Sequence, residues 1–357
     1  MIKRNKTKTV SIGSVKIGSG HPIAIQSMTK VFTTDVDRCV RQVQKLLDSG
    51  CGLVRIAVPT AADTAALAKI IAKVNAPIIA DIHFSAQRAV EAIEAGAAKI
   101  RLNPGNIKER SDINRIIDAA KAHKIAIRIG VNEASIRDLK SDTAPVKRTA
   151  LMLKEMKKYI RIFESRGFDQ IVLSAKSSNP LRTIEVNRAI SQTFDYPIHV
   201  GLTHAGLPED AAVPSAVSLG TLLAEGIGDT IRVSAAGDPV IEVKIAQQIL
   251  TSLGLLARNE PELIVCPTCG RAQLDVAKLA RKIKKAISDI DAAPSLRIAV
   301  MGCVVNGPGE AADADIAVCA GKDKAFLYVA GKKLTQLSPD SIVPAVIAEI
   351  KKKMRNR

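Results

Sequence analysis

The sequence predicts an α/β fold, a TIM-type (β/α)8 barrel followed by a smaller α/β domain. Short β-like runs, each followed by a segment with apolar residues at helical spacing, recur as eight units over about 250 residues. A GxGxxG fingerprint after the first run would favour a doubly wound sheet, and this sequence has none there. Beyond Leu255 the composition changes to a basic, cysteine-bearing segment. We therefore expect a barrel domain over residues 1–255 and a second domain over residues 256–357.

The predicted barrel strands are short and mostly apolar, and each leads into a helical pattern. The strands are Ile23–Met28, Leu53–Val58, Pro77–Ile82, Ala98–Asn103, Ala126–Val131, Gln170–Ala175, Pro197–Leu202 and Thr230–Ala235. Helical spacing is clear in Val36–Leu47, Thr64–Val74, Ala86–Ala95, Ile113–Ala122 and Leu151–Glu164. Regular alternation of this kind is typical of a closed parallel barrel.

The second domain is predicted to be a compact α/β module. After a linker near Ala257–Pro261 and a pair of cysteines comes a long basic helix, Gln273–Ile290. A strand, Leu296–Gly302, leads to a third cysteine, and a strand pair and a final helix, Ser341–Met354, complete the module.

Composition and charge narrow the class of protein. Hydrophobic residues make up 47% and charged residues 24%, which is typical of a globular protein with a large core. The net charge of +17 favours acidic partners such as phosphorylated substrates, acidic proteins or nucleic acid. Aromatic residues make up only 3% and Trp is absent, which argues against a protein that binds single-stranded nucleic acid by stacking bases on aromatic rings. We expect no nucleic-acid partner.

Apolar runs and cysteine usage bear on location. No stretch approaches the roughly 18 apolar residues of a membrane span, and the charged start, Met1–Lys8, lacks the apolar core of a secretory signal. Six cysteines are too few for a disulfide scaffold. We therefore expect a cytoplasmic protein with no membrane partner. Cys39 and Cys51 have apolar neighbours and are expected to be buried structural thiols.

Polar residues recur at alternate positions along the predicted barrel strands. Because residues two apart on a strand share a face, one inward set emerges: Arg55, Asp81, His83, Lys99, Arg101, Asn103, Arg128, Asn132, Ser174, Lys176, His199, Thr203, Arg232 and Ser234. Barrel interiors are usually packed with Val, Ile and Leu, so buried guanidinium groups are costly without anionic partners. The pattern favours a phosphate-rich substrate held by arginine forks at the mouth. The alternative is pairing with Asp and Glu as structural layers, and each histidine taken singly is more typical of a core or wall residue.

Three cysteines of the second domain form a candidate metal site. Cys266 and Cys269 make a CxxC motif, and Cys303 follows at a strand end beside a Gly/Pro turn. Zinc, a redox dithiol and iron–sulfur ligation all use CxxC. A zinc site wants a fourth soft ligand, but no His lies beyond His204, and Cys319 falls in a buried strand pattern. Glu310 is a further candidate, because three thiolates and a carboxylate would hold a [4Fe–4S] cluster with one iron on a labile oxygen ligand. Spacing alone leaves iron–sulfur, zinc and structural thiols open.

Several longer segments are specific enough to indicate a family. They are Pro22–Thr29, Ala80–Phe84, Arg101–Asn106, Arg128–Asn132, Gly226–Ser234, the CPTCGR run from Cys266 and the GCVVNGPGE run ending at Glu310. Together they span about residues 10–320, and in this order the chain resembles the GcpE family of 4-hydroxy-3-methylbut-2-enyl diphosphate synthases.

The resemblance implies an iron–sulfur oxidoreductase acting on CH or CH2 groups. The family opens the ring of 2-C-methyl-D-erythritol 2,4-cyclodiphosphate reductively in the methylerythritol phosphate (MEP) route to isoprenoids, with electrons from flavodoxin or ferredoxin. It implies a barrel joined to a cluster domain, with a [4Fe–4S] cluster on Cys266, Cys269, Cys303 and Glu310. It also implies a homodimer in which the cluster of one subunit caps the barrel mouth of the other.

The same resemblance assigns roles to residues of the barrel. It places Arg55, Arg101, Arg128 and Asn132 at positions that contact the diphosphate, and Asp81, His83 and Asn103 at the mouth. Lys176 and Arg232 join the substrate-binding set, and Glu242 matches a catalytic carboxylate that manages a proton or holds the substrate hydroxyl.

The chain departs from the family pattern on the substrate side. His204 replaces a Glu, Pro214 replaces a Lys that contacts phosphate, Lys30-Val31 replaces Asn-Thr, and Ala134 replaces a Gly. Loss of a charged contact costs about 1.5–3 kcal/mol unless another group compensates, and Lys30 and Lys176 are the candidates to do so.

Two other functions stay open at this point. The first is a divergent [4Fe–4S] oxidoreductase that acts on another phosphorylated polyol or diphosphate. The second is a zinc-stabilised basic nucleic-acid-binding protein, which predicts a colourless protein whose nucleic-acid affinity falls steeply with salt.

Overall fold

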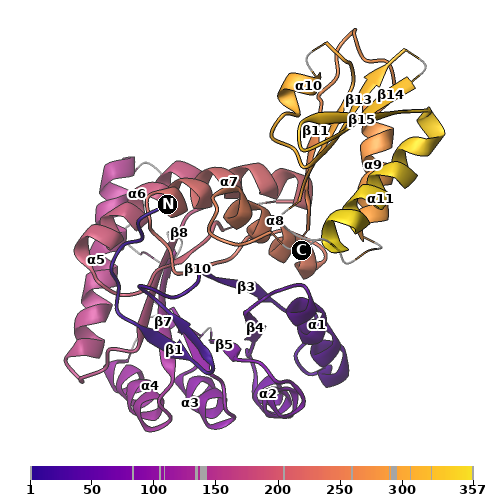
Figure 1. Cartoon of the computed structure of the whole chain (residues 1–357). Helices are drawn as coiled ribbons and strands as arrows, with labels where there is room; N and C mark the ends of the chain where they lie inside the picture. Colours follow the sequence, from indigo (N-terminus) through magenta and orange to yellow (C-terminus); the bar gives the residue numbers. More distant parts are fainter. Residues whose placement is uncertain are drawn as a thin grey trace. The chain divides into compact units, whose positions relative to one another are not determined.

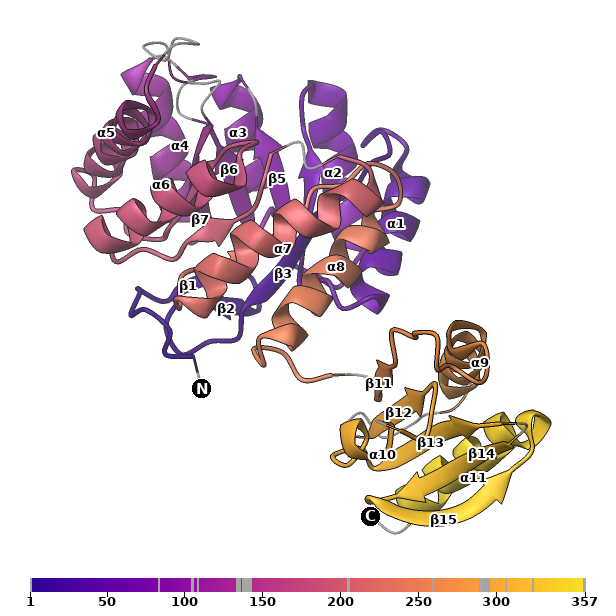
Figure 2. The ribbon, with the colours of Figure 1, turned by 90° about the horizontal axis from the view of Figure 1, so that it is seen from above.

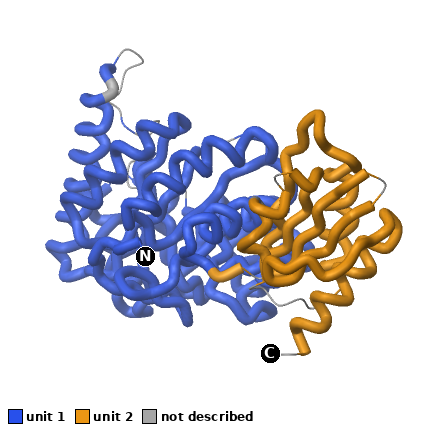
Figure 3. The backbone as a smooth tube through the Cα atoms, turned by 45° about the horizontal axis from the view of Figure 1, so that its top comes forward, with its two compact units in different colours: residues 1–256 blue, residues 257–357 orange. Residues whose placement is uncertain are grey.

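The chain forms two compact units in the computed structural model. The structure describes residues 2–82, 84–103, 106–107, 109–132, 136, 143–203, 206–258, 260–288, 290, 296–305, 307–322 and 324–355, with the side chains of Pro145 and Glu310 outside this description. Unit 1 is Met1–Leu256 and unit 2 is Ala257–Arg357 (Figure 3). In the part of the chain that the structure describes, no helix has both the length and the apolar composition needed to cross a bilayer.

Unit 1 contains an eight-stranded parallel sheet surrounded by helices (Figure 1). The strand order is β8-β7-β6-β5-β4-β3-β10-β9, and a bridge between Leu173 and Ile198 joins the two ends of the sheet. The strands are β3 (Ala24–Met28), β4 (Leu53–Ala57), β5 (Ile78–Ile82), β6 (Lys99–Leu102), β7 (Ala126–Asn132), β8 (Ile171–Lys176), β9 (His199–Val200) and β10 (Thr230–Ile231). The predicted (β/α)8 barrel is thereby confirmed. The seventh and eighth strands, expected over Pro197–Leu202 and Thr230–Ala235, have ladders of two residues only.

The barrel helices start at local signals that the sequence carries. They are α1 (Val36–Asp48), α2 (Ala61–Lys73), α3 (Ala86–Glu94), α4 (Arg110–Ala122), α5 (Pro145–Glu164), α6 (Pro180–Thr193), α7 (Pro208–Ala224) and α8 (Pro239–Ser252). Thr60 and Asp63 form a capping box before α2. The last four of these helices begin on a proline, which suits the first helical turn because its N–H has no partner there in any case.

Alternate strand residues divide the core of unit 1. Outward residues such as Val54, Ile56 and Ile100 pack against the helices in one large apolar cluster. The amino-terminal end of the barrel has a smaller cluster of its own. The hairpin of β1 (Val10–Ile12) and β2 (Val15–Ile17) packs there against the first residues of the barrel strands, among them Leu53 and Ala126. This hairpin was not among the predicted elements.

Unit 2 is a five-stranded sheet with helices on one face. Its order is β11 (Glu262–Val265), β12 (Arg297–Met301), β13 (Ile316–Gly321), β14 (Lys324–Val329) and β15 (Lys332–Leu337), with the first three strands parallel and the last two antiparallel. Helices α9 (Val276–Ser288) and α11 (Ile342–Arg355) pack on one face and share one apolar cluster with it. A short helix, α10 (Gly307–Glu310), follows β12, and a 3-10 turn, η3 (Pro339–Ser341), precedes α11.

Candidate functional site

The interior of the barrel is lined by a band of cationic side chains. In the parallel ladders Asp81 lies beside Arg101, Arg101 beside Arg128, and Asn132 beside Lys176. Paired residues of neighbouring strands face the same side. The outward neighbours of these residues belong to the apolar cluster under the helices. The alternate positions singled out in the sequence therefore do point into the barrel.

Asp81 is held between two arginines. One of its oxygens lies 3.4 Å from Nη1 of Arg101, and the other lies 3.7 Å from Nε of Arg55. Burial lowers the pKa of Arg55 to about 10, although Asp81 acts in the opposite direction. Nε and Nη2 of Arg55 also lie 3.3 and 3.1 Å from the sulfur of Met28, a weak acceptor. A single carboxylate thus serves two guanidinium groups.

Arg128 and Lys99 lie deepest in the band and are the least satisfied. Nε and Nη1 of Arg128 and Nζ of Lys99 are buried and have no hydrogen-bond partner among the described residues. Burial, and then the neighbouring Arg55, lower the pKa of Arg128 well below its usual range. Burial and the Arg128 charge do the same to Lys99. Buried donors without a partner cost about 1–3 kcal/mol each, more when charged, so these groups are suited to an anion.

Lys176 and His199 extend this band. Burial, followed by the charges of Arg128 and Arg232, lowers the pKa of Lys176 well below its usual range. His199 is fully buried, with Nδ1 lying 2.8 Å from the hydroxyl of Thr230. Burial and the nearby Lys176 lower its pKa, so the imidazole is neutral at physiological pH.

Two inward glycines make room for these cations. A Cβ at Gly201 would lie 2.7 Å from Nζ of Lys176 and 2.6 Å from the carbonyl oxygen of Arg232. A Cβ at Gly130 would lie 3.3 Å from Nε of Arg101. Any larger residue at Gly201 would collide with the backbone beside the band.

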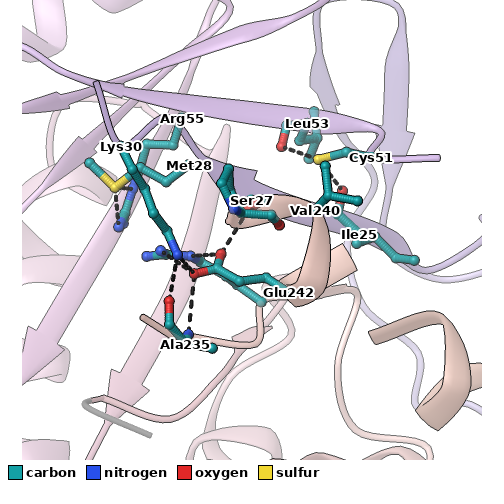
Figure 4. A network of polar contacts seen from close by, with 12 residues as sticks. Ile25, Ser27, Met28, Lys30, Cys51, Leu53, Arg55, Ala235, Val240 and Glu242 are labelled. Carbon is teal, nitrogen blue, oxygen red and sulfur yellow. Dashed lines mark hydrogen bonds and ion pairs between the residues drawn. The ribbon is translucent and has the colours of Figure 1, made fainter. Parts of the chain in front are cut away.

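Glu242 is the centre of a second network at the carboxyl-terminal end of the barrel (Figure 4). Its Oε1 accepts from the Ala235 N–H at 3.2 Å and lies 3.0 Å from Nζ of Lys30. Its Oε2 accepts from the Ser27 hydroxyl at 2.8 Å, and Arg232 contacts both oxygens at 3.2 and 3.3 Å. Lys30 also donates to the carbonyl of Ala235. Glu242 therefore has a full set of donors and holds two cations in place.

The charge on Glu242 is secured by these cations. Burial alone would raise the pKa of this carboxyl group, but Arg232 and Lys30 outweigh it, and the pKa lies below its usual value. In the sequence, Lys30 was a departure from the family pattern and a candidate to compensate for the lost lysine. Ser27 was not singled out at all, because only the fold brings residues 27, 30, 232 and 242 together.

Positive charge exceeds negative charge in this interior. The basic groups are Arg55, Lys99, Arg101, Arg128, Lys176 and Arg232, and the carboxylates that the described residues place among them are Asp81 and Glu242. Buried charges need partners of opposite sign. The arrangement is therefore electrostatically incomplete without a polyanion.

The remaining predicted barrel residues lie around this band or outside the described structure. Asn103 is buried just after β6, and Asn132 is half-buried at the end of β7. His83 lies outside the described residues, as do His204 and Ala134. Pro214 lies within α7.

The three candidate cysteine ligands of unit 2 come from two neighbouring loops. The Cys266 N–H donates to the Val300 carbonyl at 2.9 Å, and the Gln273 N–H donates to the Gly302 carbonyl at 2.9 Å. The loop that contains Cys266 and Cys269 therefore lies against the end of β12, which leads to Cys303. Cys269 is exposed, and the other two thiols are half-buried.

This donor set fits an iron–sulfur cluster in chemistry and in chain placement. Among the described residues, no three or more His, Cys, Asp or Glu side chains lie close enough together to hold a metal ion. Glu310 ends α10, two residues after Pro308, and its side chain lies outside the described residues.

The other cysteines are buried. Cys39 and Cys51 are 0% and 3% exposed, in agreement with the prediction of structural thiols. Cys319 is also fully buried, on β13, and burial together with the nearby Cys303 raises its pKa to about 11. Cys319 therefore lies near the candidate ligands.

Comparisons with known proteins agree with this organisation. A GcpE TIM-barrel domain model matches residues 7–247, and a GcpE protein C-terminal domain model matches residues 262–352. A protein of Caldanaerobacter subterraneus is named 4-hydroxy-3-methylbut-2-en-1-yl diphosphate synthase (flavodoxin). It is 43% identical in an alignment that covers 99% of this chain and 99% of its own. A protein of the same name from Symbiobacterium thermophilum is 42% identical over 99% of this chain and 95% of its own.

Solved structures with a similar fold are more distant. A dihydropteroate synthase of Stenotrophomonas maltophilia matches 68% of this chain and 98% of its own with a TM-score of 0.52 and 14% identity, which supports the barrel fold alone. The family models cover nearly the whole chain, as does the alignment with the two relatives. The chain belongs to the GcpE family.

Proposed function

We propose that the chain reduces 2-C-methyl-D-erythritol 2,4-cyclodiphosphate to 4-hydroxy-3-methylbut-2-enyl diphosphate, in the MEP route to isoprenoids. The names of relatives more than 40% identical over nearly the full length support this reaction. The structural observation that carries the proposal is the buried cation band with too few carboxylates. A cyclic diphosphate supplies the missing negative charge.

Substrate binding falls to the arginines and Lys176. In this proposal Arg55, Arg101 and Arg128 donate to phosphate oxygens, which guanidinium forks suit well. Asp81 keeps two of these forks oriented while the ligand is absent, through its contacts at 3.4 and 3.7 Å. Binding the diphosphate satisfies the buried donors of Arg128, and much of the binding energy comes from that source.

Cys266, Cys269, Cys303 and Glu310 are proposed to hold a [4Fe–4S] cluster. When bound, such a cluster delivers low-potential electrons and acts as a Lewis acid. The overall reaction consumes two electrons and two protons. It breaks a carbon–oxygen bond of the ring and releases one hydroxyl group as water. Excluding bulk water from the site is a task of the barrel itself, whose amino-terminal end is closed by apolar side chains.

Glu242 acts in this proposal through the groups that it holds. It aligns Arg232 and Lys30 at the rim, and its own charge is stabilised by them. Lys30 thereby adds a cation at the rim, at a position where the family pattern has a neutral residue.

Partners and location complete the proposal. Flavodoxin is the proposed electron donor, because the relatives' names include it. We also propose a homodimer, from the family resemblance, and a cytoplasmic location, where cysteine thiols stay reduced.

Anaerobic purification followed by iron and sulfide analysis tests the cluster, and turnover of the cyclodiphosphate with a one-electron reductant tests the reaction. We expect Cys303→Ala to lose the iron and Cys319→Ala, the matched buried thiol, to keep it. A cluster without turnover of the cyclodiphosphate would favour an oxidoreductase with another phosphorylated substrate. A colourless protein that contains zinc would contradict both.

A further inference from the structure

One surface of unit 2 combines aromatic rings with ammonium groups. Phe326 and Tyr328 lie on the same face of β14, because they alternate with the buried Ala325 and Leu327. Nζ of Lys333 lies 3.8 Å from the centre of the Phe326 ring, and Nζ of Lys324 lies 5.6 Å from it. We name Lys324, Phe326, Tyr328 and Lys333 the β14–β15 patch.

This patch lies on the cysteine side of the sheet. Phe326 is directly opposite Cys319 in the antiparallel ladder, and Tyr328 is opposite Ala317. Such partners have Cα atoms about 4.5–5.5 Å apart. Cys319 belongs to an apolar cluster against which both Tyr328 and the proposed ligand Cys266 pack. A short path therefore leads from the patch through Cys319 to a proposed cluster ligand.

The opposite face of the sheet is covered. Helices α9 and α11 pack there against Ala325 and Leu327, and Figure 2 shows α11 behind β14 and β15. Phe326 and Tyr328 remain half-exposed. They are the aromatic residues of unit 2, in a chain whose aromatic content is only 3%.

The charge of the patch is of one sign. Residues 324–337 contain three lysines and no acidic residue. Lysines on an edge strand discourage unwanted sheet pairing, which accounts for Lys332 and Lys333 on β15. It does not account for Lys324, because β14 is paired on both sides. Nor does it account for two ammonium groups beside one ring.

We propose that the β14–β15 patch is the docking surface for an acidic electron-carrier protein of the flavodoxin class. The lysines attract the carboxylates of such a carrier, and the two rings supply the apolar contact area at the centre of the interface. An electron then passes from the reduced carrier, which is oxidised, to the cluster, which is reduced. This inference rests on the proposed function, because the electron needs the cluster that the proposed function requires.

Charge reversal with a matched control tests the proposal. The double variant Lys324→Glu/Lys333→Glu alters the patch, and Lys278→Glu/Lys282→Glu makes the same change of net charge on exposed positions of α9. At low salt we expect the patch variant to raise the KM for reduced flavodoxin about tenfold or more, with the α9 variant near the unaltered chain. All three proteins should turn over equally with dithionite, which needs no docking surface.

Other outcomes overturn the proposal. If both double variants raise the KM equally, only net charge matters, and if neither does, the carrier docks elsewhere. Failure of the unaltered chain to turn over with dithionite would instead count against the proposed function. In that case, calorimetric titration of the chains with oxidised flavodoxin still decides the docking site, since weaker binding only by the patch variant supports it.

Discussion

Binding of a diphosphate to the barrel interior should take up protons. In the free chain, burial and neighbouring cations lower the pKa values of Lys99, Lys176 and His199 well below their usual range. An anion beside these groups reverses the effect of the cations. A phosphate charge about 4 Å from an amine stabilises its charged form by about 4 kcal/mol at an effective dielectric constant of about 20. This is about a thousandfold in the protonation equilibrium.

We therefore expect pyrophosphate binding to take up protons, so that its Kd rises with pH across the neutral range. Calorimetric titration in two buffers with different ionisation enthalpies measures the proton count directly. Lys176→Met keeps a long unbranched side chain but removes the amine, so it should lower the number of protons taken up. Lys278→Met, an exposed control on α9, should not. Heats independent of the buffer, with a Kd constant across the neutral range, would refute the reasoning.

Three further predictions concern stability. For the free chain, amines whose pKa is lowered in the folded state bind fewer protons there than in the unfolded state, so the free energy of unfolding should rise from neutral pH to about 8.5. Above that pH the buried thiols of Cys51 and Cys319, whose pKa is raised to about 11, act in the opposite direction. Urea unfolding at several pH values checks this, and a curve that falls between neutral pH and about 8.5 contradicts it. Glu242→Gln should cost about 3–5 kcal/mol, because it leaves Lys30 and Arg232 without their carboxylate, and a urea midpoint equal to that of the unaltered chain would show that the network is not stabilising. Gly201→Ala should lower the free energy of unfolding by about 1–3 kcal/mol and weaken pyrophosphate binding through Lys176. Gly220→Ala in α7, where a Cβ meets nothing within 4 Å, should instead raise the free energy of unfolding by about 0.5–1 kcal/mol. Thermal unfolding and the same titration distinguish the two variants, and equal effects would contradict the clash at Gly201.

The barrel and its lining were predictable because both depend on local periodicity. Arg101 and Arg128 were assigned inward from alternation alone, and their ladder pairing agrees. The β1–β2 hairpin escaped prediction because each strand has three residues, too few to show a period. The extents of β9 and β10 were overestimated, since an apolar run continues beyond the hydrogen-bonded ladder.

The candidate sites were predictable only in their components. The inward cations follow from strand parity, but the Glu242 network needs contacts between residues more than 200 positions apart, such as Ser27 and Glu242. The CxxC motif and Cys303 were visible as a spacing, whereas their common position at the end of β12 depends on the pairing of β11 with β12. Cys319 was recognised as a buried strand residue, but its neighbour Phe326 comes from a different strand.

The β1–β2 hairpin covers the amino-terminal end of the barrel. Val10, Ile12 and Ile17 are fully buried at the amino-terminal end of the barrel. A molecule that enters at the opposite end must depart by the same route. In the proposed function, departing diphosphate and arriving cyclodiphosphate thus exclude one another, and we expect accumulated product to inhibit the enzyme competitively.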